Sequence, residues 1–213
     1  MAKFVAVTES VKNLSELDER FGLRRSEDAS FFNEWQDDLP ELSEAEQRSL
    51  HTLRRRLLYH RADGELLEGA VTLLVASPLL ELAGFYDPPF KMRAEAAIEL
   101  TIEDGDETLR GRIDVLIMQS RLWILVLESK KTTISTRSAL PQVLAYMLAN
   151  QLSQPTFGML TNGDDVLFIK LSRQPDTICD LSRAFSLYTL PSEAQATLQI
   201  LKRLGQTALQ SPT

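Results

Sequence analysis

Two carboxylates and a lysine lie in or beside two apolar stretches of the chain, residues 112–118 and 122–129. Asp114 stands in the first stretch, Glu128 near the end of the second, and Lys130 just beyond it. Both stretches are rich in Ile, Val and Leu, which is typical of strands buried on both faces. Because an isolated buried charge is costly, these side chains must compensate one another or hold a cation.

Whether the two carboxylates meet depends on how the two stretches pair as a hairpin. Side chains alternate along a strand, so Asp114 shares a face with Glu128 only in some registers. Pairing Met118 with Leu122 or with Ile124 meets this condition and leaves an odd-numbered loop. The second register places Asp114 opposite Glu128, with Cβ atoms roughly 5 Å apart. Carboxylates that close repel each other unless a divalent cation lies between them or one of them takes up a proton.

The residue types around this pair indicate which cation would fit. Lys130 follows Glu128 at a spacing of two and therefore faces the same way. Hard oxygen ligands, with no Cys and no His nearby, favour Mg²⁺ or Mn²⁺ over Zn²⁺. A lysine at this position is suited to orienting a water molecule or to stabilising charge on a phosphate. The pattern therefore predicts a divalent-cation site with a lysine beside it.

An Asp followed by a strand turn and then Glu-x-Lys resembles the pattern of the PD-(D/E)xK nuclease superfamily. In this chain it is Ile113-Asp114 followed by Glu128-Ser129-Lys130. Ile113 stands where the family has proline, a departure that does not touch the chemistry.

Two further pieces of sequence agree with this resemblance. Downstream, Gln142 and Tyr146 are similar to the Q-x-x-x-Y motif of the branch that contains recombination helicase-nucleases and type I restriction motor subunits. Upstream, Glu68 and residues 78–80 resemble the first motif of the type I restriction nuclease domain, a helical Glu followed by a Pro-Leu-Leu turn and a Gly. The resemblance covers roughly residues 60–170, and the order and spacing of all its pieces agree.

The resemblance implies a metal site and assigns its ligands. One or two Mg²⁺ (or Mn²⁺) ions would be bound by four groups, which are the carboxylates of Glu68, Asp114 and Glu128 and the main-chain carbonyl of Leu127. Glu65 lies three residues before Glu68, on nearly the same helix face, and is the alternative helix-borne ligand.

The resemblance also implies roles for three other side chains. Lys130 would position or deprotonate the attacking water. Gln142 would touch a nucleotide or a ligand carboxylate, and Tyr146 would touch a phosphate or a base. The alternative for Gln142 and Tyr146 is a pair on the helix surface, because residues four apart are neighbours there.

Composition limits the class of protein. The chain has 213 residues, of which 44% are hydrophobic and 25% are charged, as is ordinary for a globular protein. No apolar run approaches the length of a membrane span and no leader pattern opens the chain, so we expect no membrane association. One cysteine, Cys179, excludes an intrachain disulfide framework, and a reducing cytoplasm is the simple expectation. The net charge of −7 argues against a general nucleic-acid coat protein.

The predicted fold is α/β: a restriction-endonuclease-like core with a mixed sheet of five or six strands, helices on both faces and a helical N-terminal region. Residues 1–40 would be an extension packed on the core, and residues 41–213 the nuclease domain. Phe31, Phe32 and Trp35 have helical spacing, which predicts a helix packed onto the core. Strands are expected at 94–102, 112–118, 122–129, 157–161, 166–171 and 184–188, and helices at 44–60, 65–75, 77–83, 137–151 and 191–206.

The leading function is a metal-dependent nuclease that acts on DNA. The sequence contains no G-x-x-x-x-G-K-[ST] motif, so it would act alone or with a protein partner that supplies specificity; a homodimer is one such arrangement. The alternative is a catalytically silent, nuclease-like binding module in a DNA-processing complex, which the net charge of −7 favours. The intact Glu-Ser-Lys with Asp114 disfavours it, because a silent site has no need of buried charges. A third reading is a purely structural α/β domain.

Overall fold

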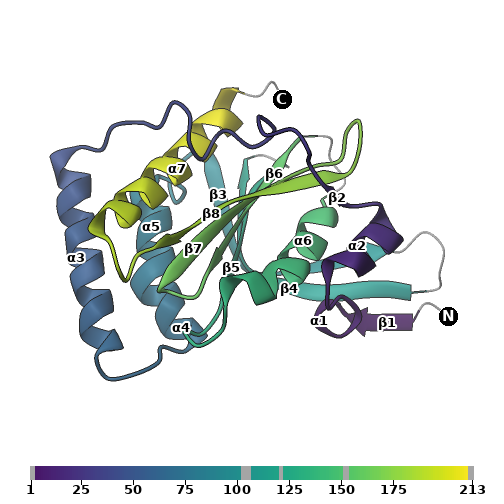
Figure 1. Cartoon of the computed structure of the whole chain (residues 1–213), viewed down its shortest axis with the longest axis horizontal. Helices are drawn as coiled ribbons and strands as arrows, with labels where there is room; N and C mark the ends of the chain where they lie inside the picture. Colours follow the sequence, from purple (N-terminus) through teal and green to yellow (C-terminus); the bar gives the residue numbers. More distant parts are fainter. Residues whose placement is uncertain (1–2, 102–106, 120–121, 151–153, 211–213) are drawn as a thin grey trace.

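The computed structural model describes residues 3–101, 107–119, 122–150 and 154–210. Within these residues the chain forms an eight-stranded mixed sheet with helices against both faces (Figure 1). The strands are β1 (Lys3–Ala6), β2 (Arg24–Arg25), β3 (Phe90–Thr101), β4 (Glu107–Gln119), β5 (Leu122–Ser129), β6 (Thr156–Thr161), β7 (Asp165–Ser172) and β8 (Ile178–Ser186).

The strand β4 has three partners, and this arrangement creates the setting of the candidate site. Along one edge β4 pairs with β3 in antiparallel fashion. On the other edge the first half of β4 pairs with β1 in parallel, and the second half, from Val115 onward, pairs with β5 in antiparallel fashion. Residues 111–114 therefore lie between the two partners on that edge, where side chains from elsewhere can approach the strand.

The rest of the sheet continues from β5 in the order β6, β7, β8 and β2. The strands β5 and β6 are parallel, as the predicted strand–helix–strand connection requires, and β6, β7 and β8 are antiparallel neighbours. The connection between β5 and β6 contains η2 (Thr136–Ala139) and α6 (Leu140–Leu148). This topology places the end of β5 beside the start of α6.

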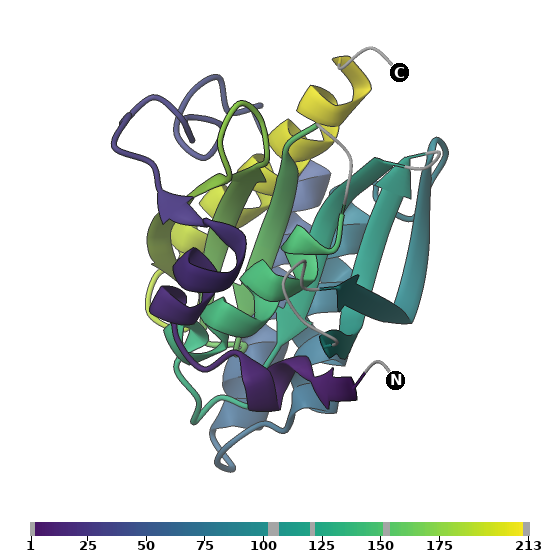
Figure 2. The same cartoon turned by 90° about the vertical axis from the view of Figure 1, so that its right-hand side faces the viewer.

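Helices cover both faces of the sheet. One face carries α3 (Glu44–Arg61), α4 (Glu68–Val71), η1 (Thr72–Ala76), α5 (Ser77–Leu82) and α7 (Pro191–Gln210). The other face carries α6 together with α1 (Val7–Ser10) and α2 (Leu14–Phe21). Figure 2 shows α6 and the N-terminal helices in front of the sheet and the longer helices behind it. No helix within the described ranges is long and apolar enough to cross a membrane.

The predicted α/β class, mixed sheet and helical N-terminal region are confirmed. The sheet has eight strands rather than five or six, because the N-terminal region adds β1 beside β4 and β2 beside β8. The last predicted strand, 184–188, was placed too late in the chain, since β8 spans Ile178–Ser186. Asp104-Gly105-Asp106, whose Asp-Gly pair predicts a hairpin turn, lies outside the described residues.

The helix predicted around Phe31, Phe32 and Trp35 is wrong, whereas their packing onto the core is confirmed. Residues 29–32 and 34–36 form turns, yet Phe32 is buried and its ring centroid lies 6.1 Å from that of Phe157. The Asp28 side chain accepts hydrogen bonds from Ser30, which competes with helix formation.

The helix predicted to begin at Glu65 begins at Glu68 instead. Leu66 and Thr132 exchange hydrogen bonds, and Leu67 has an extended backbone, so residues 65–67 cannot join the helix. From Glu68 the chain runs without a break through α4, η1 and α5. The two predicted helices are therefore joined by the wide π-helical turn η1, which ends just before Ser77 and Pro78, and proline has no N–H to continue the α pattern.

Candidate active site

The hairpin of β4 and β5 brings the two predicted carboxylates face to face. Val115 pairs with Leu127, and in this register Asp114 lies opposite Glu128. Asp114 is the last residue before the stretch of β4 that β5 covers, so its side chain is only half-buried while Glu128 is 2% exposed.

The route to this register differs from the prediction. Met118 pairs with Trp123, and Gln119 pairs with Leu122, rather than Met118 pairing with Leu122 or Ile124. A β-bulge then inserts Ile124 as an extra residue in β5 and shifts the register by one. The predicted odd-numbered loop is therefore wrong, and the bulge restores the parity that places the carboxylates together.

Asp114 is held by the residue that follows Glu128. Its Oδ2 accepts hydrogen bonds from the main-chain N–H of Ser129 at 2.7 Å and from Ser129 Oγ at 2.8 Å. Ser129 Oγ lies 2.9 Å from Thr72 Oγ1, and Thr72 Oγ1 lies 3.0 Å from the carbonyl oxygen of Glu68. A continuous chain of polar contacts thus connects β4, β5 and the first turn of α4.

The two oxygens of the Glu128 carboxylate differ in their hydrogen bonding. Its Oε1 accepts from Lys130 Nζ at 2.7 Å and from Gln142 Nε2 at 2.6 Å. Its Oε2 is buried without a hydrogen-bond partner. Burial raises the pKa of Glu128 to about 7, and the charge of Asp114 adds to this rise while Lys130 opposes it. Ionised Glu128 therefore has no partner for the charge at Oε2, and a cation there would supply one.

Lys130 lies between two carboxylates. Its Nζ is 2.7 Å from Glu128 Oε1 and 3.6 Å from Glu68 Oε1. Burial alone would lower the pKa of Lys130, but the charges of Glu128, Glu68 and Asp114 outweigh it and raise that pKa. Lys130 is thus held as an ammonium ion.

The structure separates the two candidate glutamates of the helix. Glu68 is the first residue of α4, is 55% exposed and contacts Lys130. Glu65 lies on the preceding loop, where its carboxylate accepts from Thr133 Oγ1 at 2.9 Å and stands 3.9 Å from Lys131 Nζ. Glu68 is therefore the one that meets the Glu128–Lys130 pair.

Gln142 and Tyr146 lie on the face of α6 that meets the sheet. Gln142 Nε2 donates to Glu128 Oε1 and, at 2.8 Å, to the hydroxyl of Tyr146. Tyr146 is 3% exposed, so the surface-pair alternative is wrong for this residue. Burial raises the pKa of Tyr146, and the charge of Glu128 raises it further. The main-chain N–H of Arg112 also donates to its hydroxyl.

Gly111 is a residue for which the sequence predicts no role. A Cβ at this position would lie 2.4 Å from Tyr146 Cε1, so only glycine lets the tyrosine ring approach β4. The available signal was an isolated glycine inside a strand pattern, which marks close approach of another group. Leu127, predicted as a main-chain ligand, is buried in the sheet between Val115 and Met159, and its assignment stays a prediction.

The carboxylate oxygens at this site are donors of the kind that hard divalent cations prefer. The carboxylates of Glu128 and Glu68 contact Lys130, and Asp114 lies opposite Glu128. One buried oxygen of Glu128 has no partner. Within the described ranges no group of three or more His, Cys, Asp or Glu side chains is close enough together to hold a metal. The ammonium group of Lys130 lies between Glu128 and Glu68, within 4 Å of an oxygen of each.

Comparison with known proteins identifies the family. The sequence model described as "Type I restriction enzyme R protein N terminus" matches residues 32–177, more than half of the chain. A solved fragment assigned to an HsdR subunit of a type I restriction enzyme from Vibrio vulnificus YJ016 is 19% identical, with a TM-score of 0.42 over 63% of this chain. The match spans 26% of that fragment. No curated protein sequence matches significantly. From the family match, the chain belongs to the family of type I restriction enzyme R protein N-termini.

Proposed function

We propose that this protein is a Mg²⁺- or Mn²⁺-dependent nuclease that cuts DNA, with Glu68, Asp114 and Glu128 as its carboxylate ligands. The family to which the chain belongs supports a nuclease-like role in a type I restriction system. The main-chain carbonyl of Leu127 would complete the ligand set.

The observation that carries this proposal is the unpartnered oxygen of Glu128. A buried carboxylate oxygen without a hydrogen bond is costly to the fold, and few native groups are left so. Asp114 lies opposite Glu128 and adds a second negative charge. Such an arrangement lowers stability without a cation, so its presence supports a site that binds one.

The chain's own residues would then divide the work of phosphodiester hydrolysis. A bound Mg²⁺ would lower the pKa of its water and stabilise charge on the phosphate. Asp114 is fixed for this task by the two hydrogen bonds from Ser129, and Glu128 is fixed by the one from Gln142. Lys130, held as an ammonium ion, would stabilise negative charge on the phosphate or orient the attacking water.

Gln142 and Tyr146 are proposed to act at the same site. Gln142 bonds Glu128 directly, which agrees with the predicted contact to a ligand carboxylate. The hydroxyl of Tyr146 accepts a hydrogen bond from Gln142. We propose that DNA is the substrate. A protein partner, or a second copy of the chain, would supply the specificity.

One assay tests this function. Supercoiled plasmid and single-stranded DNA are incubated with wild-type protein and Mg²⁺, Mn²⁺ or chelator, in parallel with Asp114→Ala and Lys130→Ala. Asp176→Ala, at an exposed residue, is the matched control. Cleavage that needs the ion, persists in the control and is lost in both site variants is the expected result. Equal cleavage by all four proteins would indicate a contaminating nuclease and sink the proposal.

The competing function is a nuclease-like binding module that does not cut. The net charge of −7 and the ion pairs of Lys130, which partly neutralise the carboxylates, favour it. No cleavage by any variant, together with Mn²⁺ binding that is lost in Glu128→Ala, would support this function instead.

A further inference from the structure

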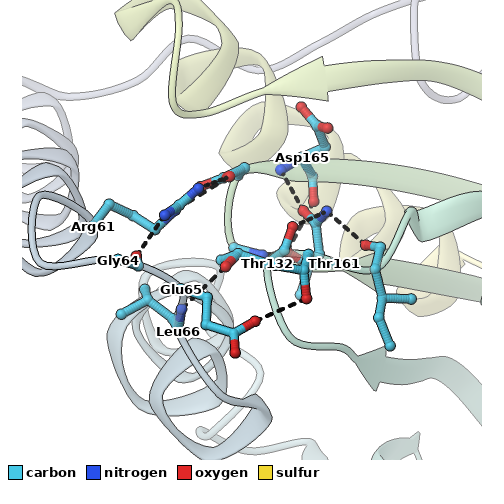
Figure 3. Close-up of polar contacts among 12 residues, drawn as sticks. Arg61, Gly64, Glu65, Leu66, Thr132, Thr161 and Asp165 are labelled. Atoms are coloured by element: carbon cyan, nitrogen blue, oxygen red, sulfur yellow. Dashed lines mark hydrogen bonds and ion pairs between the residues drawn. The ribbon is translucent and has the colours of Figure 1, made fainter.

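Thr132 joins the loop that precedes Glu68 to the loop that follows β5. The main-chain N–H of Leu66 donates to Thr132 Oγ1 at 3.0 Å, and the N–H of Thr132 donates to the carbonyl of Leu66 at 3.1 Å. Figure 3 shows Leu66 and Thr132 side by side, with the chain leading from Gly64 through Glu65. Thr132 is buried, so this pair of bonds is protected from water.

These bonds fix the entry of the chain into α4. The N-cap residue Leu67 provides no side-chain hydrogen bond to the helix. Glu68 is the next residue, and its carboxylate reaches Lys130 although more than half of it is exposed. The position of Glu68 therefore depends mainly on how its backbone is held, by the anchoring of Leu66 on one side and by the contact of Thr72 with its carbonyl oxygen on the other.

Thr132 is itself tied to the rigid end of the sheet. Asn162, which is buried, donates its Nδ2 to the carbonyl of Ile134 at 2.9 Å and to that of Thr132 at 3.5 Å. The main-chain N–H of Lys130 donates to the carbonyl of Thr161 at 2.8 Å. The loop after Lys130 is thus held at both ends by β6 and the turn that follows it.

A second anchor holds the far end of the loop before α4. Arg61 contacts Asp164 with Nε and Nη2, both at 2.9 Å, and its Nη1 donates to the carbonyl of Gly64 at 2.5 Å (Figure 3). Residues 64–66 are therefore clamped between Arg61 and Thr132. Leu66, which Thr132 holds, is nearer to Glu68 in sequence than Gly64, which Arg61 holds. Thr132 also lies only two residues after Lys130.

We propose that Thr132 is a positioning residue that sets the distance between Glu68 and the Glu128–Lys130 end of β5, and thereby the affinity of the site for a divalent cation. The inference rests on the proposed function for the role of Glu68 as a ligand. Replacing Thr132 by valine keeps the shape of the side chain and removes the acceptor for Leu66 N–H.

The test compares the wild type with three single variants by two measurements, and then repeats the Thr132→Val change in a Glu68→Gln background. Hydrogen exchange of the amides of residues 66–72, without added metal, reports whether the loop is held. Calorimetric titration with Mn²⁺ reports the affinity of the site. The variants are Thr132→Val, Thr132→Ser, which keeps the hydroxyl, and Thr133→Val, a neighbour whose hydroxyl contacts Glu65 instead.

Thr132→Val is expected to speed exchange at residues 66–72 and to weaken Mn²⁺ binding about ten- to a hundredfold, as loss of a group that orients a ligand does. Thr132→Ser and Thr133→Val should both stay near the wild-type values. In a Glu68→Gln background, Thr132→Val should cause no further weakening, because it acts through Glu68.

The failure of this inference is distinguishable from the failure of the proposed function. Unchanged exchange in Thr132→Val, or equal weakening with and without Glu68, would overturn the inference alone. Wild-type protein that does not bind Mn²⁺ would overturn the proposed function and the cation role of Thr132 with it. If Thr132→Val does not fold, Thr132→Ala removes the same acceptor and replaces it in each comparison.

Discussion

The ring of Tyr146 lies against the backbone of Gly111, at a distance that leaves no room for a side chain on the strand. A Cβ at Gly111 would stand 2.4 Å from Cε1 of the ring. The tyrosine hydroxyl accepts from Gln142, and Gln142 in turn donates to Glu128. The glycine of β4 therefore determines how closely α6 brings its polar residues to the buried carboxylate.

Gly111→Ala should destabilise the protein by about 1–3 kcal/mol, because the ring is buried and cannot move away from the added methyl group. Gly69→Ala is the matched control, since a Cβ there would meet no atom within 4 Å. Gly69 lies in α4, where alanine is a better helix former than glycine. The Gly69→Ala variant should therefore be as stable as the wild type or slightly more stable. Urea unfolding measures both, and equal midpoints would contradict the predicted clash.

Tyr146 and Gln142 should differ in what they contribute to the site. Gln142→Leu removes a direct hydrogen bond to Glu128, whereas Tyr146→Phe removes only the hydroxyl that accepts from Gln142. Gln142→Leu should therefore weaken Mn²⁺ binding more than Tyr146→Phe. Because Tyr146 is almost fully buried, Tyr146→Phe should change the KM for DNA by no more than about twofold. A loss of about 1.4 kcal/mol of binding free energy would instead change it tenfold. Calorimetry and cleavage kinetics give the two quantities. A large rise in KM for Tyr146→Phe would mean that the hydroxyl touches the substrate.

Much of the site could be predicted because its residues belong to short patterns. The strands of Asp114 and Glu128, and the helix of Gln142 and Tyr146, follow from periodicity within a few residues. The bulge at Ile124 could not be predicted, because it depends on how two strands pair rather than on either strand alone.

The choice between Glu65 and Glu68 shows the same limit. Helical spacing places both on one face, whereas the structure removes Glu65 from the helix through the bonds between Leu66 and Thr132. These partners are far apart in the sequence, and no local pattern records their contact. Burial of Phe32 could likewise be predicted from its apolar character, but not the turn that carries it.

Divalent cations should stabilise the protein through Glu128. An ion present at a hundred times its Kd adds about 2.7 kcal/mol to the free energy of unfolding. For a chain of this size that corresponds to a rise in Tm of roughly 5–10 °C. Thermal unfolding with Mn²⁺ and with chelator should show this rise in the wild type and in Asp176→Ala, but not in Glu128→Ala. The same rise in Glu128→Ala would place the ion elsewhere.

The ion pair between Glu46 and Lys202 should make stability depend on acid pH. The hydrogen bond from Lys202 lowers the pKa of Glu46 to about 2. Burial opposes this lowering, and the hydrogen bonds from Ser43 add to it. A carboxyl whose folded pKa is depressed stabilises the fold above its unfolded pKa, near 4.5, and loses that contribution as pH falls towards 2. The stability gap between wild type and Glu46→Gln should therefore be largest above pH 4.5 and close as pH falls.

Urea unfolding at several pH values between 2 and 7 measures this gap. Glu44→Gln is the control, because Glu44 lies in the same helix turn but is exposed, and its ion pair is with the exposed Arg48. The gap for Glu44→Gln should be small, as is usual for an exposed ion pair. A gap for Glu46→Gln that stays constant down to pH 2 would show that the ion pair does not lower this pKa.

Breaking the pair of Glu34 and Lys170, the most buried ion pair outside the site among the described residues, should be costly to the fold. Lys170 Nζ lies 2.6 Å from Glu34 Oε1 and donates to the carbonyl of Phe31 at 2.7 Å, which fastens the N-terminal turns to β7. Their side chains are 13% and 11% exposed. Lys170→Met leaves the Glu34 carboxylate buried and unpaired, which should cost about 3–5 kcal/mol.

The double variant Glu34→Gln/Lys170→Met should lose less stability than Lys170→Met alone, because no uncompensated charge remains. The exposed pair of Arg48 and Glu44, with side chains 72% and 90% exposed, provides the contrast. Arg48→Met should change stability by less than about 0.5 kcal/mol. Urea unfolding of these variants completes the comparison. A double variant as unstable as Lys170→Met would mean that the lysine stabilises the fold through Phe31 and its packing rather than through the charge of Glu34.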